Sequence, residues 1–404
     1  MDTAELSISE LAPQRAQLRV AMVTETYPPE VNGVARTMGL MVDGLRARDH
    51  AVQLIRPRQG SADRAENGAN FEELLRPGMA IPRYAQLRMG LPARQALLRA
   101  WALRRPDVVH VATEGPLGWS ALSAAQKLRL PVTSDFRTNF HAYSRHYGAG
   151  WLTRPIAAYL RKFHNRAECT LVPTEQMSAE LAALGFERLR VVGRGVNAQT
   201  FHPDKRSEAL RARWQAGPDT LVALCVSRFA AEKNFPLLIE GYKAMQAVRG
   251  DSRLVLVGDG PLAEELRNAG VGIVVAGRKV NGELSMHYAS ADAFLFPSTT
   301  ETFGNVTLEA MACGLGIAAY DYAAARQYLR HGESALLAAF DQPADFVAQC
   351  VELARDLPRV RALGAAARHI AAELSWERVV GDFEHALLEA IDVSAERARA
   401  RQAA

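Results

Sequence analysis

The stretch 290–314, SADAFLFPSTTETFGNVTLEAMACG, constrains the fold of this chain most strongly. Its apolar run 293–296 is typical of a buried parallel strand, which Pro297 would end. A polar turn follows, and from Asn305 the apolar side chains recur with helical spacing. Open α/β sheets bind phosphorylated ligands where a strand gives way to a turn and a helix amino terminus. We therefore expect an α/β protein with a ligand site at this turn.

The same alternation of strand and helix runs through both halves of the chain. The first half opens with a predicted strand at 18–23, a loop, a helical pattern and a strand at 51–55, which together form a right-handed βαβ unit. Further predicted strands lie at 108–111, 131–134 and 170–172, and in the second half at 221–226, 253–257 and 272–275. The pattern predicts two Rossmann-like, doubly wound domains that face a cleft.

The length supports this division, because 404 residues are too many for one ordinary core. We expect a disordered lead at 1–17, a first domain at 18–200, a second domain at 201–375 and a solvated tail at 392–404. The polar segment 203–219 shows little pattern and would bridge the domains. A helical pattern at 376–391 is long enough to pack on either domain.

Composition excludes several classes of protein. The net charge of +4 is too small for a dedicated nucleic-acid binder, so no nucleic-acid partner is expected. Four widely spaced cysteines indicate neither a disulfide framework nor a zinc site, which favours a reduced, cytoplasmic setting. No apolar run approaches the roughly 18 residues of a membrane-spanning helix. The loop after the first strand lacks a Gly-x-Gly-x-x-Gly fingerprint, which argues against a dehydrogenase.

Two cations follow the first strand of the second half. Arg228 and Lys233 would share the loop at the carboxyl end of the strand 221–226. A guanidinium and an ammonium at that edge are suited to neutralising a diphosphate. The alternative is a pair of solvated surface cations.

Three further loops place backbone or charge near the same edge. Gly258 opens the turn Gly-Asp-Gly-Pro, for which an ordinary strand-to-helix connection is the favoured interpretation and ligand contact the second. Arg278 ends an Ala-Gly-Arg turn that would let a nucleobase meet backbone groups. Gly33, in the loop after the first strand, would let the backbone approach a ligand closely.

Two glutamates mark the turn in the stretch 290–314. Glu309, inside the predicted helix, can accept hydrogen bonds from two vicinal hydroxyls, as a ribose presents them, or it is simply a partner of the helix dipole. Glu301 lies on the turn itself, where backbone amides would hold sugar hydroxyls and phosphate oxygens. The other donor-binding candidates of this turn are Phe303, Gly304, Asn305 and Val306.

These residues resemble those of the retaining glycosyltransferases of the large fourth family, which have two Rossmann-like domains (the GT-B type). The similarity covers about 18–388 and is nearest to the branch of lipid-directed α-mannosyltransferases and sulfoquinovosyl transferases. It is carried by Glu301 with Glu309, by Arg228 with Lys233, by the turn 258–261 and by the loop 32–34.

The resemblance implies a division of labour. The second domain would bind a nucleoside diphosphate sugar and the first the acceptor, and the helix 376–391 would cross back to the first domain. Glu309 would hold the ribose and Glu301 a sugar hydroxyl, while Arg228 and Lys233 would stabilise the departing diphosphate. No metal or other cofactor is expected, and the sequence has no Asp-x-Asp motif. Retention would follow from attack on the face that the nucleotide leaves, without a protein nucleophile.

The chain departs from the family pattern in one segment that bears on chemistry. The family usually has a histidine where this chain has Arg137, in the segment 135–141. Either Arg137, which we favour on register, or His141 would contact the donor sugar. A permanent cation would favour a sugar that carries a carboxylate or sulfonate. The alternative is that Arg137 pairs with Asp135 and touches no substrate. Two other departures, at 313–317 and 320–326, concern loop shape.

Basic residues suggest where the acceptor is met. The segment 81–106 has no acid and interleaves leucines with six arginines: Arg83, Arg88, Arg94, Arg99, Arg104 and Arg105. Such a surface suits an anionic membrane and a lipid or glycolipid acceptor, which would place the enzyme peripherally on the cytoplasmic membrane face. The alternative is a packed helix with a solvated basic face. A second basic run lies at 154–166.

The sequence therefore predicts a metal-independent retaining glycosyltransferase. GDP-mannose is the first donor expected, with UDP-linked glucose, glucuronate or sulfoquinovose transferred to diacylglycerol as the alternative. Candidates from other classes are a nucleotide-sugar 2-epimerase, which needs no acceptor, and a binding protein that never releases nucleoside diphosphate.

Overall fold

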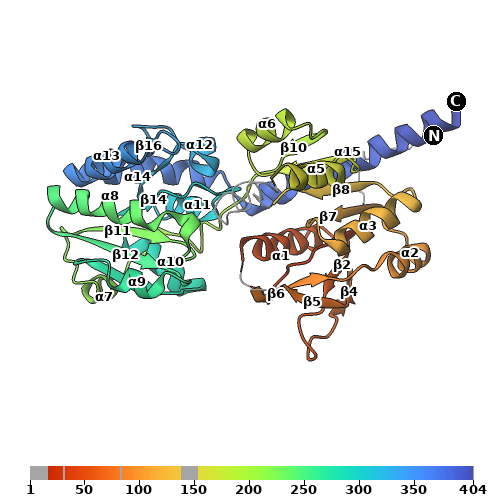
Figure 1. Ribbon diagram of the computed structural model, residues 1–404, viewed down its shortest axis with the longest axis horizontal. Helices are drawn as coiled ribbons and strands as arrows, with labels where there is room; N and C mark the ends of the chain where they lie inside the picture. Colours follow the sequence, from red (N-terminus) through yellow and green to blue (C-terminus); the bar gives the residue numbers. More distant parts are fainter. Residues whose placement is uncertain (1–16, 31, 82–83, 138–152, 404) are drawn as a thin grey trace, which may run out of the picture.

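The computed structural model describes residues 17–30, 32–81, 84–137 and 153–403. Its strands form two large parallel sheets, each covered by helices, which lie in separate lobes (Figure 1). We call the lobe built on the earlier strands, together with the last helix, the first domain, and the other lobe the second domain. The described part of the chain is thus a mixed α/β protein with two Rossmann-like sheets.

The first domain is built on an eight-stranded sheet in the order β10-β9-β8-β7-β1-β2-β4-β3, parallel throughout except for the pair β3 and β4. Its strands are β1 (Arg19–Val23), β2 (Ala51–Pro57), β3 (Asn67–Gly68), β4 (Phe71–Arg76), β7 (Val108–Val111), β8 (Val132–Asp135), β9 (Cys169–Val172) and β10 (Leu189–Val191). A separate hairpin consists of β5 (Gly78–Ile81) and β6 (Tyr84–Gly90). The helices are α1 (Gly33–Arg46), α2 (Arg94–Leu103), α3 (Pro116–Lys127), α5 (Thr153–His164) and α6 (Glu175–Ala183).

The second domain has six parallel strands in the order β13-β12-β11-β14-β15-β16. Counted along the chain this is 3-2-1-4-5-6, the order of dinucleotide-binding folds, and its direction reverses between β11 and β14. The strands are β11 (Leu221–Val226), β12 (Ser252–Val257), β13 (Ile273–Gly277), β14 (Ala293–Phe296), β15 (Gly316–Tyr320) and β16 (Leu336–Ala338). The helices are α7 (Glu208–Arg213), α8 (Phe235–Val248), α9 (Ala263–Arg267), α10 (Asn281–Ser290), α11 (Asn305–Ala312), α12 (Ala323–Tyr328), α13 (Pro343–Arg355) and α14 (Leu357–Ala372).

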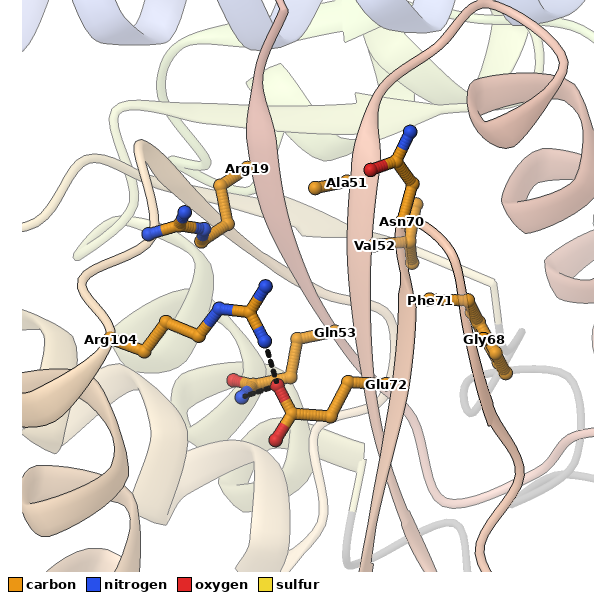
Figure 2. A pocket seen from close by; sticks show the side chains of 9 residues that line it. All are labelled: Arg19, Ala51, Val52, Gln53, Gly68, Asn70, Phe71, Glu72 and Arg104. Atoms are coloured by element: carbon orange, nitrogen blue, oxygen red, sulfur yellow. Dashed lines mark hydrogen bonds and ion pairs between the residues drawn. The ribbon is translucent and has the colours of Figure 1, made fainter.

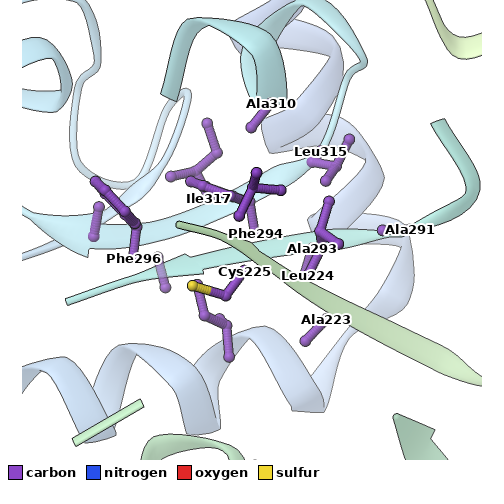
Figure 3. Close-up of a cluster of buried hydrophobic side chains, with 14 of the residues drawn as sticks. Ala223, Leu224, Cys225, Ala291, Ala293, Phe294, Phe296, Ala310, Leu315 and Ile317 are labelled. Carbon is purple, nitrogen blue, oxygen red and sulfur yellow. The ribbon is translucent and has the colours of Figure 1, made fainter. Parts of the chain in front are cut away.

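The core of the second domain centres on the strand that the sequence marked first. Side chains of β11, β14 and β15 meet there, and α11 covers them with Ala310 (Figure 3). Phe294 and Ile317 are fully buried in this cluster. Because both neighbours of β14 are parallel strands and α11 lies on one face, its near-continuous apolar run is satisfied on both sides. The burial fixes the carboxyl ends of β11 and β14 side by side.

The last helix, α15 (Trp376–Ala403), returns to the first domain (Figure 1). Val380, Phe383 and Leu387 are buried with residues of β1 and α1. Buried Glu384 accepts a hydrogen bond from Arg48, 2.6 Å from Nη1 to Oε2, so the packing is also held by charge. The helix is longer than the predicted 376–391, because it continues through most of the expected tail as an exposed extension.

The segment 81–106 is not one basic amphipathic surface, and its helical part favours the alternative of a packed helix. Part of it is the hairpin strand β6, and in α2 the side chains of Leu97 and Trp101 are fully buried in the first core. Trp101 Nε1 donates to Gln53 Oε1 at 2.9 Å. Leu91, one of the apolar residues that suggested a membrane surface, is exposed, and so is Leu103 at the end of α2.

The bridge 203–219 is likewise more ordered than its composition suggested. It contains the helix α7, whose Arg211 is fully buried. Arg211 Nη1 lies 3.0 Å from Asp292 Oδ2, and Nη2 donates to the carbonyl of Thr220 at 2.8 Å. Arg211, with its many donors, anchors this segment together with buried Leu210 and Trp214, and hydrophobic periodicity does not detect the polar part of that anchor.

A pocket at the amino ends of β1 and β2 lies away from the edge where ligands are expected. It is lined by Arg19, Gln53, Glu72 and Arg104, among others (Figure 2). Glu72 accepts from Arg104 Nη1 and from Gln53 Nε2, both at 3.2 Å. Three of its polar side chains, Gln53, Glu72 and Arg104, are thus paired with one another, and parallel sheets bind ligands at the opposite, carboxyl edge.

Candidate active site

Lys233 and Glu301 form an ion pair at the strand-order reversal of the second sheet. Lys233 ends a 3₁₀ turn (Ala231–Lys233) after β11, and Glu301 lies in the loop after β14. Ser298 Oγ also donates to Glu301 Oε1 at 2.7 Å. Burial alone would raise the pKa of Glu301, but Lys233 and Ser298 hold that pKa below its usual value. The carboxylate is therefore ionised and already oriented.

Arg228 pairs with Glu232 on the same loop after β11. The arginine side chain is 42% exposed, whereas the glutamate is 1% exposed. The carbonyl of Glu232 in turn accepts from Thr300 Oγ1 at 3.3 Å, which joins this loop to the one that carries Glu301. Both predicted phosphate cations thus lie on one loop, and each is held by a carboxylate.

Glu309 is buried in α11 and pairs with a residue of the first domain. Its Oε1 lies 2.7 Å from Nη1 of Arg36, one turn into α1. The glutamate is 6% exposed and the arginine 48%. Burial raises the pKa of Glu309, and Arg36 only partly opposes this. A ligand hydroxyl that bound Glu309 would share it with Arg36 or displace it.

The start of α11 faces the start of α1. The nearest atom to a Cβ built on Gly33 would be Asn305 Nδ2, at 3.9 Å. Asn305 Oδ1 is buried and has no hydrogen-bond partner among the residues that the structure describes. Gly304, with φ +91°, turns the chain into the helix, a conformation that glycine adopts without strain. The two loops thus bring a glycine backbone and an unsatisfied amide oxygen together.

The neighbouring Phe303 and Val306 hold this turn in place. Phe303 is buried, and its carbonyl accepts from the backbone of Ala324 at 2.9 Å. Val306 packs against the second core, and its carbonyl accepts from Tyr288 at 3.4 Å. Their observed contacts are within the protein.

The loops of Gly258 and Arg278 are less informative. Gly258, with φ +154°, leaves no space for a side chain because the carbonyl of Ser227 packs against it. That close approach is a structural reason for glycine at this position. Arg278 is exposed just after β13, beyond Gly277.

Arg137 forms an ion pair with Asp135, the last residue of β8. This is the pairing that the sequence left open as an alternative to sugar contact. Burial alone would raise the pKa of Asp135, but Arg137 and His110 hold it well below its usual range. His141, the other candidate for the family histidine role, lies outside the described residues.

Sequence reasoning missed two arginines that the tertiary structure adds. Arg36 falls one helical turn after Gly33, so the glycine loop was a signal for it. Arg194 follows β10 and is buried, with Nη1 donating to the carbonyls of Val192 at 3.1 Å and Gly193 at 2.9 Å. The position of Arg194 just beyond a strand end of the first domain was the available signal.

The two departures in loop sequence have local consequences. Gly314, with φ +73°, carries the chain from α11 into β15. Ala323 has φ +52°, a left-handed conformation that costs an alanine energy and a glycine none. It lines a small pocket together with Ser298, Glu301 and Tyr322. Tyr322 donates to the carbonyl of Glu301 at 2.9 Å.

Neither a metal cluster nor a membrane span is found in the described parts of the chain. No three histidine, cysteine, aspartate or glutamate side chains there gather as metal ligands. Likewise, none of the helices in those ranges is long and apolar enough to cross a bilayer.

The arrangement suits stabilisation of a leaving phosphate. Two cations stand on a strand-end loop at the topological switch point, and two carboxylates face it from the next strand's loop and helix. Fixed cations at the place where negative charge develops make an electrostatic contribution that often dominates catalysis. The carboxylates provide acceptors for hydroxyl groups.

Comparison with known proteins identifies the family of the chain. Glycosyltransferase Family 4 matches residues 31–200, and Glycosyl transferases group 1 matches 220–356. A GDP-mannose-dependent alpha-mannosyltransferase of Mycolicibacterium smegmatis is 32% identical over 92% of this chain and 98% of its own length. Sulfoquinovosyl transferase SQD2 of Arabidopsis thaliana is 30% identical over 74% of this chain and 59% of that protein.

A solved structure shares the architecture. Sucrose-phosphate synthase from Thermosynechococcus elongatus superposes with a TM-score of 0.73 at 19% identity, covering 93% of this chain and all of that one. At this identity the likeness concerns the fold alone. Together with the family models and the relatives, it identifies the chain as a GT-B glycosyltransferase that belongs to glycosyltransferase family 4.

Proposed function

We propose that the protein transfers a sugar from a nucleoside diphosphate to a lipid acceptor, with retention of configuration and without a metal. The observation that carries the proposal is the meeting of Lys233, Glu301 and Arg228 where the second sheet reverses strand order. GDP-mannose is the first donor because the Mycolicibacterium relative is a GDP-mannose-dependent mannosyltransferase. A sulfoquinovose donor is the alternative that the sulfoquinovosyl relative supports.

The residues divide the task as follows. Arg228 and Lys233 neutralise the departing diphosphate, while Glu309 takes the ribose hydroxyls and Glu301 a sugar hydroxyl. The unsatisfied Oδ1 of Asn305, beside Gly33, accepts from the donor or the acceptor. The leaving phosphate oxygen takes the proton of the attacking hydroxyl, which attacks the same face. In this mechanism no carboxylate of the chain acts as a nucleophile.

The first domain would receive the acceptor at a membrane surface on the cytoplasmic side. Its candidates for membrane contact are the arginines of α2 and the exposed Leu91 and Leu103. The basic end of α5, with Arg161 and Lys162, adds positive charge. The contact area is smaller than the sequence suggested, because Leu97 and Trp101 point into the core.

A donor panel tests the proposal. Purified protein is incubated with GDP-mannose, UDP-glucose and UDP-glucuronate, with and without vesicles that contain diacylglycerol or phosphatidylinositol, and released nucleoside diphosphate is measured. We expect release that depends on vesicles for one donor, and its loss by orders of magnitude in Glu309→Ala. Release without transferred product would indicate a hydrolase, whereas conversion of the donor into its epimer without net release would indicate an epimerase. Binding with neither release nor epimerisation would indicate a non-catalytic protein.

A further inference from the structure

The carboxyl edge of the first sheet holds a buried group of charges that do not cancel. Arg137 and Arg194 are each 6% exposed. Arg137 follows β8, and Arg194 follows β10, which is separated from β8 only by β9. We call Arg137, Arg194, Asp135 and His110 the arginine cluster.

The cluster carries one positive charge in excess. Asp135 is its carboxylate, and it is ion-paired with Arg137. His110 lies 3.7 Å from Asp135, but burial lowers the pKa of this histidine, so it is neutral at pH 7. Arg194 donates to backbone carbonyls and has no carboxylate partner among the described residues. Burial first, and the nearby Arg137 second, lower the pKa of Arg194 to about 9, which still leaves it charged.

Arg137 also has a hydrogen-bond donor that no described residue accepts. Arg137 Nε is buried without a hydrogen-bond partner in the described part of the chain. The segment 138–152, which follows Arg137 directly, contains no aspartate or glutamate, so its sequence offers no counter-ion. An unpaired charge in a buried site is costly and is normally compensated by a partner.

The position of the cluster is that of a substrate site. Ligands of open parallel sheets bind at the carboxyl ends of the strands, where these residues lie. The loop of Arg194 abuts the second domain, because a side chain at Gly193 would lie 2.7 Å from the hydroxyl of Tyr328 in α12. The excess charge therefore stands on the side of the first domain that meets the second.

We infer that the arginine cluster binds an anionic group of the substrate, a carboxylate, sulfonate or phosphate, other than the diphosphate of the donor. This inference rests on the proposed function and deepens it by naming a substrate class. The group comes either from an acidic donor sugar or from the phosphate of an anionic lipid acceptor. In both cases paired arginines offer the planar donors that such anions accept.

The donor source is tested by binding of matched donors. Isothermal titration calorimetry compares UDP-glucuronate with UDP-glucose, and GDP-mannuronate with GDP-mannose, on wild type, Arg194→Gln, Arg194→Lys and an exposed control, Arg355→Gln. The members of each pair share base and diphosphate, so contributions of Arg228 and Lys233 cancel. If the sugar supplies the anion, wild type and control prefer the acidic member about tenfold or more, and Arg194→Gln loses the preference. Arg194→Lys, which keeps the charge, retains part of it.

The acceptor source is tested with vesicles. The variants are assayed for nucleoside diphosphate release on phosphatidylcholine vesicles that carry equal mole fractions of phosphatidylinositol or diacylglycerol. If the lipid supplies the anion, wild type prefers phosphatidylinositol about tenfold in kcat/KM, and Arg194→Gln does not. Co-sedimentation measures binding of the protein to the same vesicles, so the preference for phosphatidylinositol can be detected even without turnover.

The outcomes separate the inference from the proposed function. Equal binding of both members of every donor pair and both vesicles by wild type overturns the inference, even if Arg194→Gln does not fold. An anion preference that persists in folded Arg194→Gln also overturns it. Donor binding with anion preference but no transfer would reject the proposed function and keep the anion site.

Discussion

The carboxyl edges of the two sheets handle charge in opposite ways. At the edge of the second sheet, Arg228 is paired with Glu232 and Lys233 with Glu301, so each cation has a carboxylate partner within the protein. At the edge of the first sheet, Arg137 is paired with Asp135, whereas buried Arg194 has no carboxylate partner among the described residues. A site whose cations are already ion-paired must exchange those pairs for contacts with the ligand when it binds. A site with an unpaired buried cation instead gains a partner for that cation from the ligand. The first domain is therefore the one that we expect to bind an anionic group, because its two buried arginines have only one carboxylate between them, Asp135.

The carboxyl edge of the first sheet also holds a carboxylate, Glu25, whose charged form is disfavoured by burial. Glu25, after β1, accepts from the backbone of Leu117 at the start of α3. Burial and the nearby Glu114 raise its pKa to about 7, despite the backbone donors. In the second domain, by contrast, the pKa of Glu301 is lowered. The two carboxylates thus differ, because Lys233 and Ser298 compensate the burial of Glu301, whereas backbone donors do not fully compensate the burial of Glu25.

The largest effect is expected when one cation is removed from the ion-paired edge of the second sheet. Lys233→Ala removes a fixed cation from the leaving phosphate and leaves Glu301 without its ion-pair partner, so kcat should fall about 10²–10³-fold. The measurement is nucleoside diphosphate release under saturating donor. Lys243→Ala, an exposed lysine on α8, is the matched control and should keep full activity. Activity of Lys233→Ala within a few fold of wild type would contradict the assignment.

The second effect concerns the pH dependence of Glu25. Its pKa is about 7 in the folded protein and 4.5 as the ordinary value, so the folded state binds the extra proton between these limits. Stability should therefore fall as pH rises from about 4.5 to 7, by about 2–3 kcal/mol. Urea unfolding at pH 5 and pH 8 measures it, as the difference between wild type and Glu25→Gln.

Glu72→Gln, at the opposite edge of the same sheet, controls for the loss of a carboxylate in general. If the difference in unfolding free energy between wild type and Glu25→Gln does not change with pH, the pKa of Glu25 is not raised in the folded protein. The contrast between the two edges would then rest on the arginine cluster alone.

The third effect tests the contact between the domains. Arg36→Ala leaves buried Glu309 without its cation and should lower the free energy of unfolding by about 1–2 kcal/mol, a value reduced because Arg36 is half-exposed. The loss should shrink at low pH, because protonation of Glu309 removes the unpaired charge. The double variant Arg36→Ala/Glu309→Gln should recover most of the loss. Additive losses would mean that the two side chains are not coupled.

The smallest effect lies in the loop at 320–326. Ala323→Gly relieves a left-handed conformation and should stabilise the folded state by about 1 kcal/mol, less the extra entropy of an unfolded glycine. Thermal unfolding measures the change. Ala324→Gly, at a helical neighbour without positive φ, should destabilise instead. Destabilisation by both would indicate that Ala323 is not strained.

Much of the donor edge was predictable because its signals are local. The strand 293–296, the turn and the helix that carries Glu309 form one continuous stretch, and the structure has β14 and α11 there. Apolar periodicity gave little signal in the short helix α7, where Arg211 adds polar contacts to the burial of Leu210 and Trp214. It also left two interpretations open for 81–106, since alternation alone cannot say that Leu97 and Trp101 face inward.

The sequence by itself determined the two α/β domains and the family, because hydrophobic spacing and strand-end motifs act over short distances along the chain. Only the tertiary structure decided the partners. Arg36 meets Glu309 across 273 positions, and Arg194 reaches the surroundings of Arg137 through parallel strands whose order is not written in any local pattern. Charge balance is a sum over neighbours in space, so it becomes visible only when the strand ends are brought together.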